Sequence, residues 1–241
     1  MLCVTALLMF AACNNSEQAT SNATDTTANN SSNANTTSTT STPTSTTVTT
    51  PQNMLVVRHK VADYAKWKTA YDGHDTARVA AGLHDYVIGR GEQDSNTVMV
   101  ALKVDDTTKA MAFGKNPSLK EVMKKGGVVG QPAMSLITMV YQDTATISAR
   151  LRSVSMFTVK DWDTWLKNFQ DGQQERSDNG LVTRAYGHDV SDTHKVVVVT
   201  ALTDSAKAMA YFKSDALKKR IKDSGVEGQL NRFIYWIAQK Y

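Results

Sequence analysis

The stretch Lys109-Ala-Met-Ala112 recurs 98 residues later as Lys207-Ala-Met-Ala210. Sliding the sequence against itself by the same offset aligns residues 54–143 with 152–241 without a gap. At 24 of the 90 aligned positions the two segments carry the same residue. Identity of this extent without an insertion identifies an internal repeat. The chain is therefore predicted to contain one structural unit twice.

The hydrophobic pattern of the first copy predicts the order strand, helix, strand, strand, helix, strand. Asp63 is a natural N-cap for a helical run of about twenty residues that ends at Gly82. A second helix is predicted from Asp106, with a break at Asn116-Pro117. The β-branched and apolar segments predict strands over residues 55–57, 83–90, 97–104 and 133–141. This order is the ferredoxin-like unit, and it predicts the α+β class.

A single ferredoxin-like unit leaves one face of its sheet bare, and a partner must cover that face. The second copy can supply the partner sheet, because only a linker at residues 144–151 separates the copies and docking is then intramolecular. The sequence thus predicts ferredoxin-like repeats at 54–143 and 152–241, packed sheet to sheet as a barrel within one chain.

The run from Arg58 to Gly82 resembles the dimeric α+β barrel superfamily, and most of all its antibiotic-biosynthesis-monooxygenase-like members. The segment from Asp105 to Pro132 continues the resemblance, which covers all of the first copy and, more loosely, the second. It implies the same barrel fold. It implies no single activity, because the superfamily includes monooxygenases, haem-degrading enzymes, isomerases and proteins without known chemistry.

Residues 1–13 form a short apolar stretch typical of a secretory signal. Its ending, Phe10-Ala-Ala-Cys13, resembles a bacterial lipobox, in which the cysteine is lipidated and becomes the new N-terminus. The resemblance implies a lipid on Cys13 and a place in the bacterial cell envelope, and Asn14 after the cysteine favours the outer membrane. The alternatives are a cleaved ordinary signal and a fortuitous apolar N-terminus.

Residues 14–53 have the composition of a disordered tether, since 29 of these 40 residues are Thr, Asn or Ser. All 27 Lys and Arg follow residue 53, where they are interspersed with 21 Asp and Glu. Because basic and acidic residues are mixed so evenly, no nucleic-acid-binding surface is predicted. Apart from the lipid membrane, the expected partner is a small molecule.

The first predicted helix carries five residues at spacings of three and four, which place them on one face toward the sheet: Tyr64, Trp67, Tyr71, His74 and Arg78. An aromatic stripe of this kind can simply fill a core. The alternative is a cavity, because an inward His and Arg are costly to bury without partners. In that case Trp67 and Tyr71 would stack on a ligand, while His74 and Arg78 would orient its acidic or carbonyl group.

His59 lies on the first strand in phase with Leu55 and Val57, and its counterpart in the second copy is Phe157. A position that accepts Phe is expected to be enclosed and apolar. A neutral imidazole there would have a lowered pKa and could act as acid, base or ligand donor. A core histidine satisfied by one hydrogen bond is the alternative.

Tyr86 and Arg90 are predicted at the pocket edge, on one face of their strand together with Ile88. In the second copy Phe157 replaces His59 and Gly172 replaces His74, while Arg176 keeps the arginine. This asymmetry predicts a working pocket in the first copy and a structural partner in the second.

Four functions remain open from the sequence. The first is an envelope-tethered protein that binds a small aromatic or apolar ligand. The second is a cofactor-independent monooxygenase in which His59 or His74 deprotonates a phenolic or quinol substrate. The third is a haem-binding protein with one of these histidines as axial ligand, and the fourth is a structural module. No metal site is predicted, because the folded part lacks cysteine and shows no His-Glu-x-x-His motif.

Overall fold

The computed structural model describes residues 46–241, which belong to one compact unit. The predicted signal peptide, Cys13 and most of the predicted tether lie outside the described residues. Helices and strands follow one another in the predicted order in both repeats. Within the described residues the strands are β1 Thr47–Val48, β2 Gln52–Val61, β3 Leu83–Gly91, β4 Thr97–Val104, β5 Val128–Asp143, β6 Leu151–Val159, β7 Leu181–Asp189, β8 Lys195–Leu202 and β9 Val226–Lys240.

Each repeat contributes four helices, and the predicted cap Asp63 begins the first of them. The Asp63 side chain accepts a hydrogen bond from the backbone N–H of Lys66 at 2.6 Å, and Asp161 does the same for Thr164 at 2.8 Å. The helices are α1 Tyr64–Asp72, α2 Asp75–Ala80, α3 Thr107–Lys115, α4 Pro117–Lys125, α5 Trp162–Asp171, α6 Gln173–Asp178, α7 Ser205–Lys213 and α8 Asp215–Asp223.

The strands close into a barrel in the order β5-β2-β4-β3-β9-β6-β8-β7, and β7 pairs back with β5. Two seams join the repeats, β3 with β9 and β5 with β7, and both are antiparallel. The predicted fold class, two ferredoxin-like repeats packed as an intrachain α+β barrel, is confirmed.

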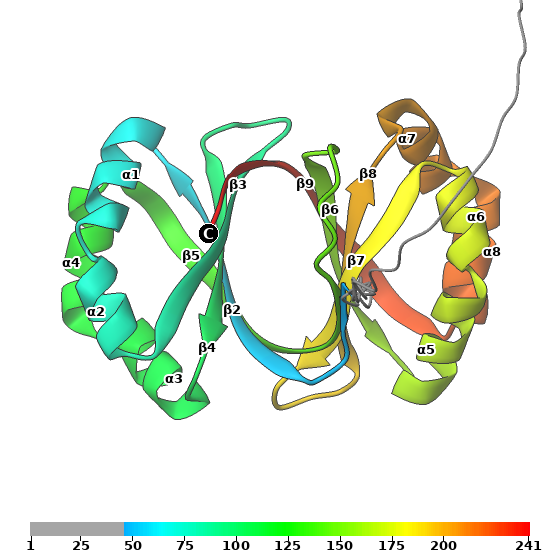
Figure 1. Ribbon diagram of the computed structural model, residues 1–241, viewed down its shortest axis with the longest axis horizontal. Helices are drawn as coiled ribbons and strands as arrows, with labels where there is room; N and C mark the ends of the chain where they lie inside the picture. Colours follow the sequence, from blue (N-terminus) through cyan, green and yellow to red (C-terminus); the bar gives the residue numbers. More distant parts are fainter. Residues whose placement is uncertain (1–45) are drawn as a thin grey trace, which may run out of the picture. The chain divides into compact units, whose positions relative to one another are not determined.

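Apolar side chains pack in two places, inside the barrel and between the helices and the outer face of the sheet. The barrel interior holds a cluster that draws on both repeats and includes Met54, Met99, Ile137, Val154 and Val197. Outside the barrel, helices cover each half separately: α1–α4 pack on the strands of the first repeat and α5–α8 on those of the second (Figure 1). A ligand can thus be enclosed either between helices and sheet or inside the barrel.

Glycines let strands approach closely at both seams. A Cβ at Gly89 would overlap the ring of Tyr235 on β9, and a Cβ at Gly187 would overlap the backbone carbonyl of Thr138 on β5. The two glycines occupy the same position of the two repeats. Their lack of a side chain therefore permits the close contact at each seam.

Three predicted boundaries differ from the structure. Regular structure begins before residue 54, because β1 pairs with the end of β5 and β2 starts at Gln52. β5 starts at Val128 rather than residue 133. The single long helix is wrong: Gly73 caps α1, and the chain restarts as α2 after His74.

A β-bulge interrupts the alternation of β3. Asp85 pairs with Leu102 and Val87 with Ala101, so Tyr86 is an extra residue. Tyr86 and Val87 consequently both face the barrel interior, whereas Ile88 packs under the helices. The prediction that Tyr86 and Ile88 share a face is therefore wrong. Repeat 2 has the same bulge, and Arg184 is its extra residue.

Candidate functional site

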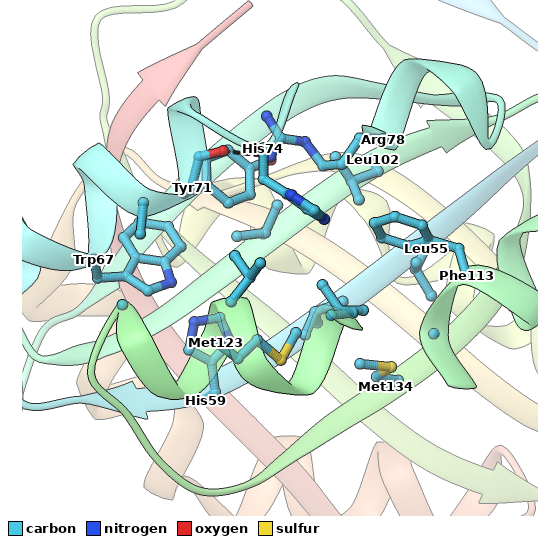
Figure 2. Close-up of a pocket in the computed structure, with 17 residues that line it drawn as sticks. Leu55, His59, Trp67, Tyr71, His74, Arg78, Leu102, Phe113, Met123 and Met134 are labelled. Carbon is cyan, nitrogen blue, oxygen red and sulfur yellow. Dashed lines mark hydrogen bonds between the residues drawn. The ribbon is translucent and has the colours of Figure 1, made fainter. Parts of the chain in front are cut away.

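A cavity of about 70 Å³ lies between the helices and the sheet of repeat 1. Strand β2 supplies His59 and helix α1 supplies Trp67 and Tyr71. His74 precedes α2 as its N-cap, and Arg78 lies in the last turn of α2 (Figure 2). The remaining wall is almost entirely apolar and includes Leu55, Leu102, Phe113, Met123 and Met134. The structure thus gathers five of the predicted residues around one space.

His59 is 6% exposed, and neither ring nitrogen has a hydrogen-bond partner in the described part of the chain. Its ring lies 5.5 Å from that of Trp67, centroid to centroid. Burial lowers the pKa of His59 to about 4, because apolar surroundings penalise the charged imidazolium. At neutral pH the imidazole is therefore uncharged, with one donor and one acceptor nitrogen left unsatisfied.

Trp67 and Tyr71 form the aromatic wall, with ring centroids 5.0 Å apart in a stacked arrangement. The Tyr71 hydroxyl donates to Asp85 on β3. Burial, followed by this hydrogen bond, raises the pKa of Tyr71, which holds the hydroxyl in its protonated form. Tyr71 therefore offers its ring to the cavity while its hydroxyl is already engaged.

Arg78 is engaged by the protein rather than free for a ligand acid. Its Nη1 donates to the Tyr71 carbonyl at 2.5 Å, and its Nη2 lies 3.1 Å from both Asp75 and Asp85. The guanidinium also stacks 3.7 Å above the Tyr71 ring. Among the described residues, Nε is the Arg78 nitrogen that lacks a partner altogether, so it can donate to a ligand.

The two histidines lie on different sides of the cavity. His59 projects from β2, while His74, at the junction of α1 and α2, packs its ring 5.9 Å from that of Phe113 (Figure 2).

Within residues 46–241, no three His, Cys, Asp or Glu side chains are grouped to hold a metal ion. In the same range no helix is long and apolar enough to cross a bilayer.

Two predicted pocket residues lie elsewhere. Tyr86 faces the barrel interior because of the bulge in β3. Arg90 stacks 4.0 Å above the ring of Tyr64 and donates from Nε to the carbonyl of Ser95 at 2.8 Å, outside the cavity wall. Asp85 was missed as a partner of Arg78, because the sequence does not show which strand residue faces a given helix residue.

Repeat 2 has a cavity of about 90 Å³ at the equivalent place, lined by Phe157 and Trp165 among others. Repeat 2 is therefore also hollow at this place, while the predicted working pocket in the first copy and structural partner in the second stay a prediction. Its polar side chains are engaged with one another: Arg232 donates to Ser155 at 3.2 Å, and Glu175 accepts from Tyr211 at 3.0 Å. Among the described residues, buried side-chain atoms without a hydrogen-bond partner occur in repeat 1 alone.

Solved structures share this fold. An anthrone oxidase-like protein matches with a TM-score of 0.56 at 11% identity, covering 81% of this chain and 95% of its own. A candidate monooxygenase from Fusobacterium nucleatum matches with a TM-score of 0.52 at 13% identity, covering 78% and 93%. A haem-binding protein from Thermus thermophilus matches with a TM-score of 0.50 at 8% identity, covering 80% and 94%.

No protein-family model matches the sequence, and no curated protein matches it. The matched structures share the α+β barrel fold that the resemblance implied. At these identities they establish a shared fold, and the activity has to be argued from the site.

Proposed function

We propose that the protein binds a small aromatic molecule with one polar group in the helix–sheet cavity of repeat 1. The observation that carries this proposal is the buried, unpartnered imidazole of His59 beside an apolar cavity. An unpaired buried polar group costs free energy, and a ligand hydroxyl or carbonyl would remove that cost. Trp67 and Tyr71 supply the aromatic surface for the ring.

The size of the cavity limits the ligand to about one ring. At about 70 Å³ it is smaller than the roughly 150 Å³ cavity that accommodates benzene in another protein. Met123 and Met134 line it, and unbranched methionine side chains readily change rotamer. We infer that these two side chains move aside when a single ring enters.

The test compares 4-methylphenol with toluene by isothermal titration calorimetry, because the two differ only in the hydroxyl group. We expect 4-methylphenol to bind about tenfold more tightly, which is the worth of one hydrogen bond to His59. His59→Leu keeps the site apolar and should abolish this difference. Phe157→Leu, the matched change in repeat 2, should preserve it.

Two outcomes would overturn the proposal. One is that neither compound binds at millimolar concentration. The other is that the His59→Leu protein still prefers 4-methylphenol as the wild type does.

Oxidation of a phenol or quinol in the same cavity is the second candidate, favoured by the shared fold of the candidate monooxygenase. The low pKa of His59 makes it a hydrogen-bond partner for the substrate rather than a strong base. Oxygen consumption with a panel of hydroquinones tests this candidate. Uptake that persists in His59→Leu would assign the reaction elsewhere.

Haem does not fit the described cavity. Drug-sized ligands occupy pockets of roughly 300–1,000 Å³, and a porphyrin is at least that large, whereas the space beside His59 is about 70 Å³. Absence of a Soret shift on adding haem to micromolar protein would agree with this conclusion.

We also propose that Cys13 carries a lipid that tethers the barrel to the outer membrane of the cell envelope. The support is the resemblance of Phe10–Cys13 to a lipobox and the polar composition of the following segment. Metabolic labelling with a palmitate analogue should mark the wild type and not Cys13→Ser. Equal labelling of both would exclude Cys13 as the attachment site.

A further inference from the structure

The barrel encloses a second and larger space, separate from the helix–sheet cavity. Its volume is about 300 Å³, within the size range of small-molecule pockets. The inner wall is apolar and comes from strands of both repeats, with Met54, Val56, Met99, Val154 and Val197. Residues 145–149 of the linker line it at the end of the barrel where β6 begins and β5 and β9 terminate.

The charges that line this space are strongly unbalanced. Four cationic side chains meet one carboxylate, Asp143. Asp143 is already used, because Arg184 donates to it at 2.6 Å and the backbone of Ala145 donates to its other oxygen at 2.9 Å. The cations are Arg150, Arg152, Arg184 and Lys240.

Arg152 is the one of the four that is buried without an ion pair. Its side chain is buried, with 7% of the residue exposed, and Nη1 donates only to the carbonyls of Ala149 and Leu151. No acidic side chain of the described chain forms an ion pair with it. Arginine does not give up its charge in proteins, so burial without a counter-ion costs free energy that a bound anion would offset.

Two tyrosine hydroxyls line the same space and have no hydrogen-bond partner among the described residues: those of Tyr86 and Tyr235. Tyr235 is buried, and burial raises the pKa of both hydroxyls. Both groups therefore remain protonated and can donate hydrogen bonds to an anionic oxygen.

When the two copies are aligned, the four cations have no charged counterpart in the first copy. The first-copy counterparts of Arg150, Arg152, Arg184 and Lys240 are uncharged: Gln52, Met54, Tyr86 and Gln142. Gln142 Nε2 donates to Gln52 Oε1 at 2.7 Å, so these two neutral side chains contact each other. The space thus has a half from repeat 1 whose charged side chain is Asp143, and a cationic half from repeat 2 and the linker.

We propose that the barrel interior is a binding site for a small organic acid with an apolar body. Its carboxylate pairs with Arg152 and accepts hydrogen bonds from Tyr86 and Tyr235. Its apolar body lies deeper in the barrel, among the methionine and valine side chains. This proposal does not depend on the function of the His59 cavity.

The test titrates the full chain with octanoate, octanamide and acetate by calorimetry. The amide matches the acid in shape but lacks its charge, and acetate lacks the apolar body. We expect octanoate to bind at least about tenfold more tightly than either, because a charge-assisted pair and apolar burial act together. Arg152→Met copies the first-repeat residue and should remove the preference for the acid.

Controls separate this site from the rest of the molecule. Arg152→Met should unfold at the same temperature as the wild type or a higher one, since it removes a buried unpaired charge, so lost binding then reports on the site. Arg58→Met at the other barrel end and His59→Leu should leave octanoate binding unchanged. Equal affinity for octanoate and octanamide, unchanged binding in Arg152→Met, or loss of binding in His59→Leu would each overturn the proposal.

Discussion

The environment of His59 was predictable from the sequence in part. The same position holds Phe157 in repeat 2, and that comparison alone predicted an enclosed, apolar environment. The structure places His59 in such an environment, and its pKa falls to about 4. The missing hydrogen bond was not predictable, because a partner for a buried ring depends on the side chains that reach it from other elements.

The pKa of His59 predicts a dependence of stability on pH. An unfolded histidine takes up a proton near pH 6.5, whereas the folded one resists until about pH 4, so the unfolded state gains protons first as the pH falls. The free energy of unfolding should therefore decrease between pH 6.5 and 4, by roughly 2 kcal/mol at pH 5. Urea unfolding of wild type and His59→Phe at several pH values measures it.

In this comparison His59→Phe should lack that part of the decrease, while exposed His194→Phe should retain it. Parallel pH profiles for wild type and His59→Phe would contradict the assignment.

At the scale of elements, periodicity predicted the order of strands and helices but not their interruptions. The bulges at Tyr86 and Arg184 carry no glycine or proline signal, yet each shifts the inward face of a strand by one residue. The helix break lies at Gly73, a glycine within the predicted helical run that the prediction did not use as a helix end. Alternation arguments consequently failed where the barrel gains its inward-facing Tyr86 and Arg184.

Arg78 joins α1, α2 and β3, and the repeat provides a matched comparison. Arg176 makes the equivalent contact with the Phe169 carbonyl at 2.6 Å, but its strand partner is neutral Thr183 where Arg78 has Asp85. Arg78→Met should cost about 3–5 kcal/mol because Asp85 would remain buried without its cation. Arg176→Met leaves no strand carboxylate without its cation, so it should lower the free energy of unfolding by about 1–3 kcal/mol.

Urea unfolding at pH 7 measures both losses. Equal losses in the two variants would show that the Arg78–Asp85 ion pair adds nothing to the shared packing role.

For the whole molecule, the repeat was sufficient to predict a closed barrel, because each sheet had a bare face and a partner tethered close by. The interior cavity was not predicted. From the sequence alone, nothing distinguishes Arg152, Arg184 and Lys240 from ordinary surface charges. Their inward placement follows only from the strand register, the bulge and the closure of both seams. The two repeats thus have the same backbone fold but contribute different charges to the barrel interior.

That difference predicts how separated repeats associate. Residues 46–146 should form a homodimer, since two copies would close the seams around an interior lined by Met54 and Tyr86, whose charged lining is reduced to the two Asp143 side chains. Residues 147–241 should not form a stable homodimer, because each interior cation would occur twice without Asp143, and like charges in an enclosed space repel. Mixing the two fragments should instead yield a one-to-one complex. Sedimentation velocity measures all three species, and a homodimer of residues 147–241 as stable as that of 46–146 would contradict this account of the interior.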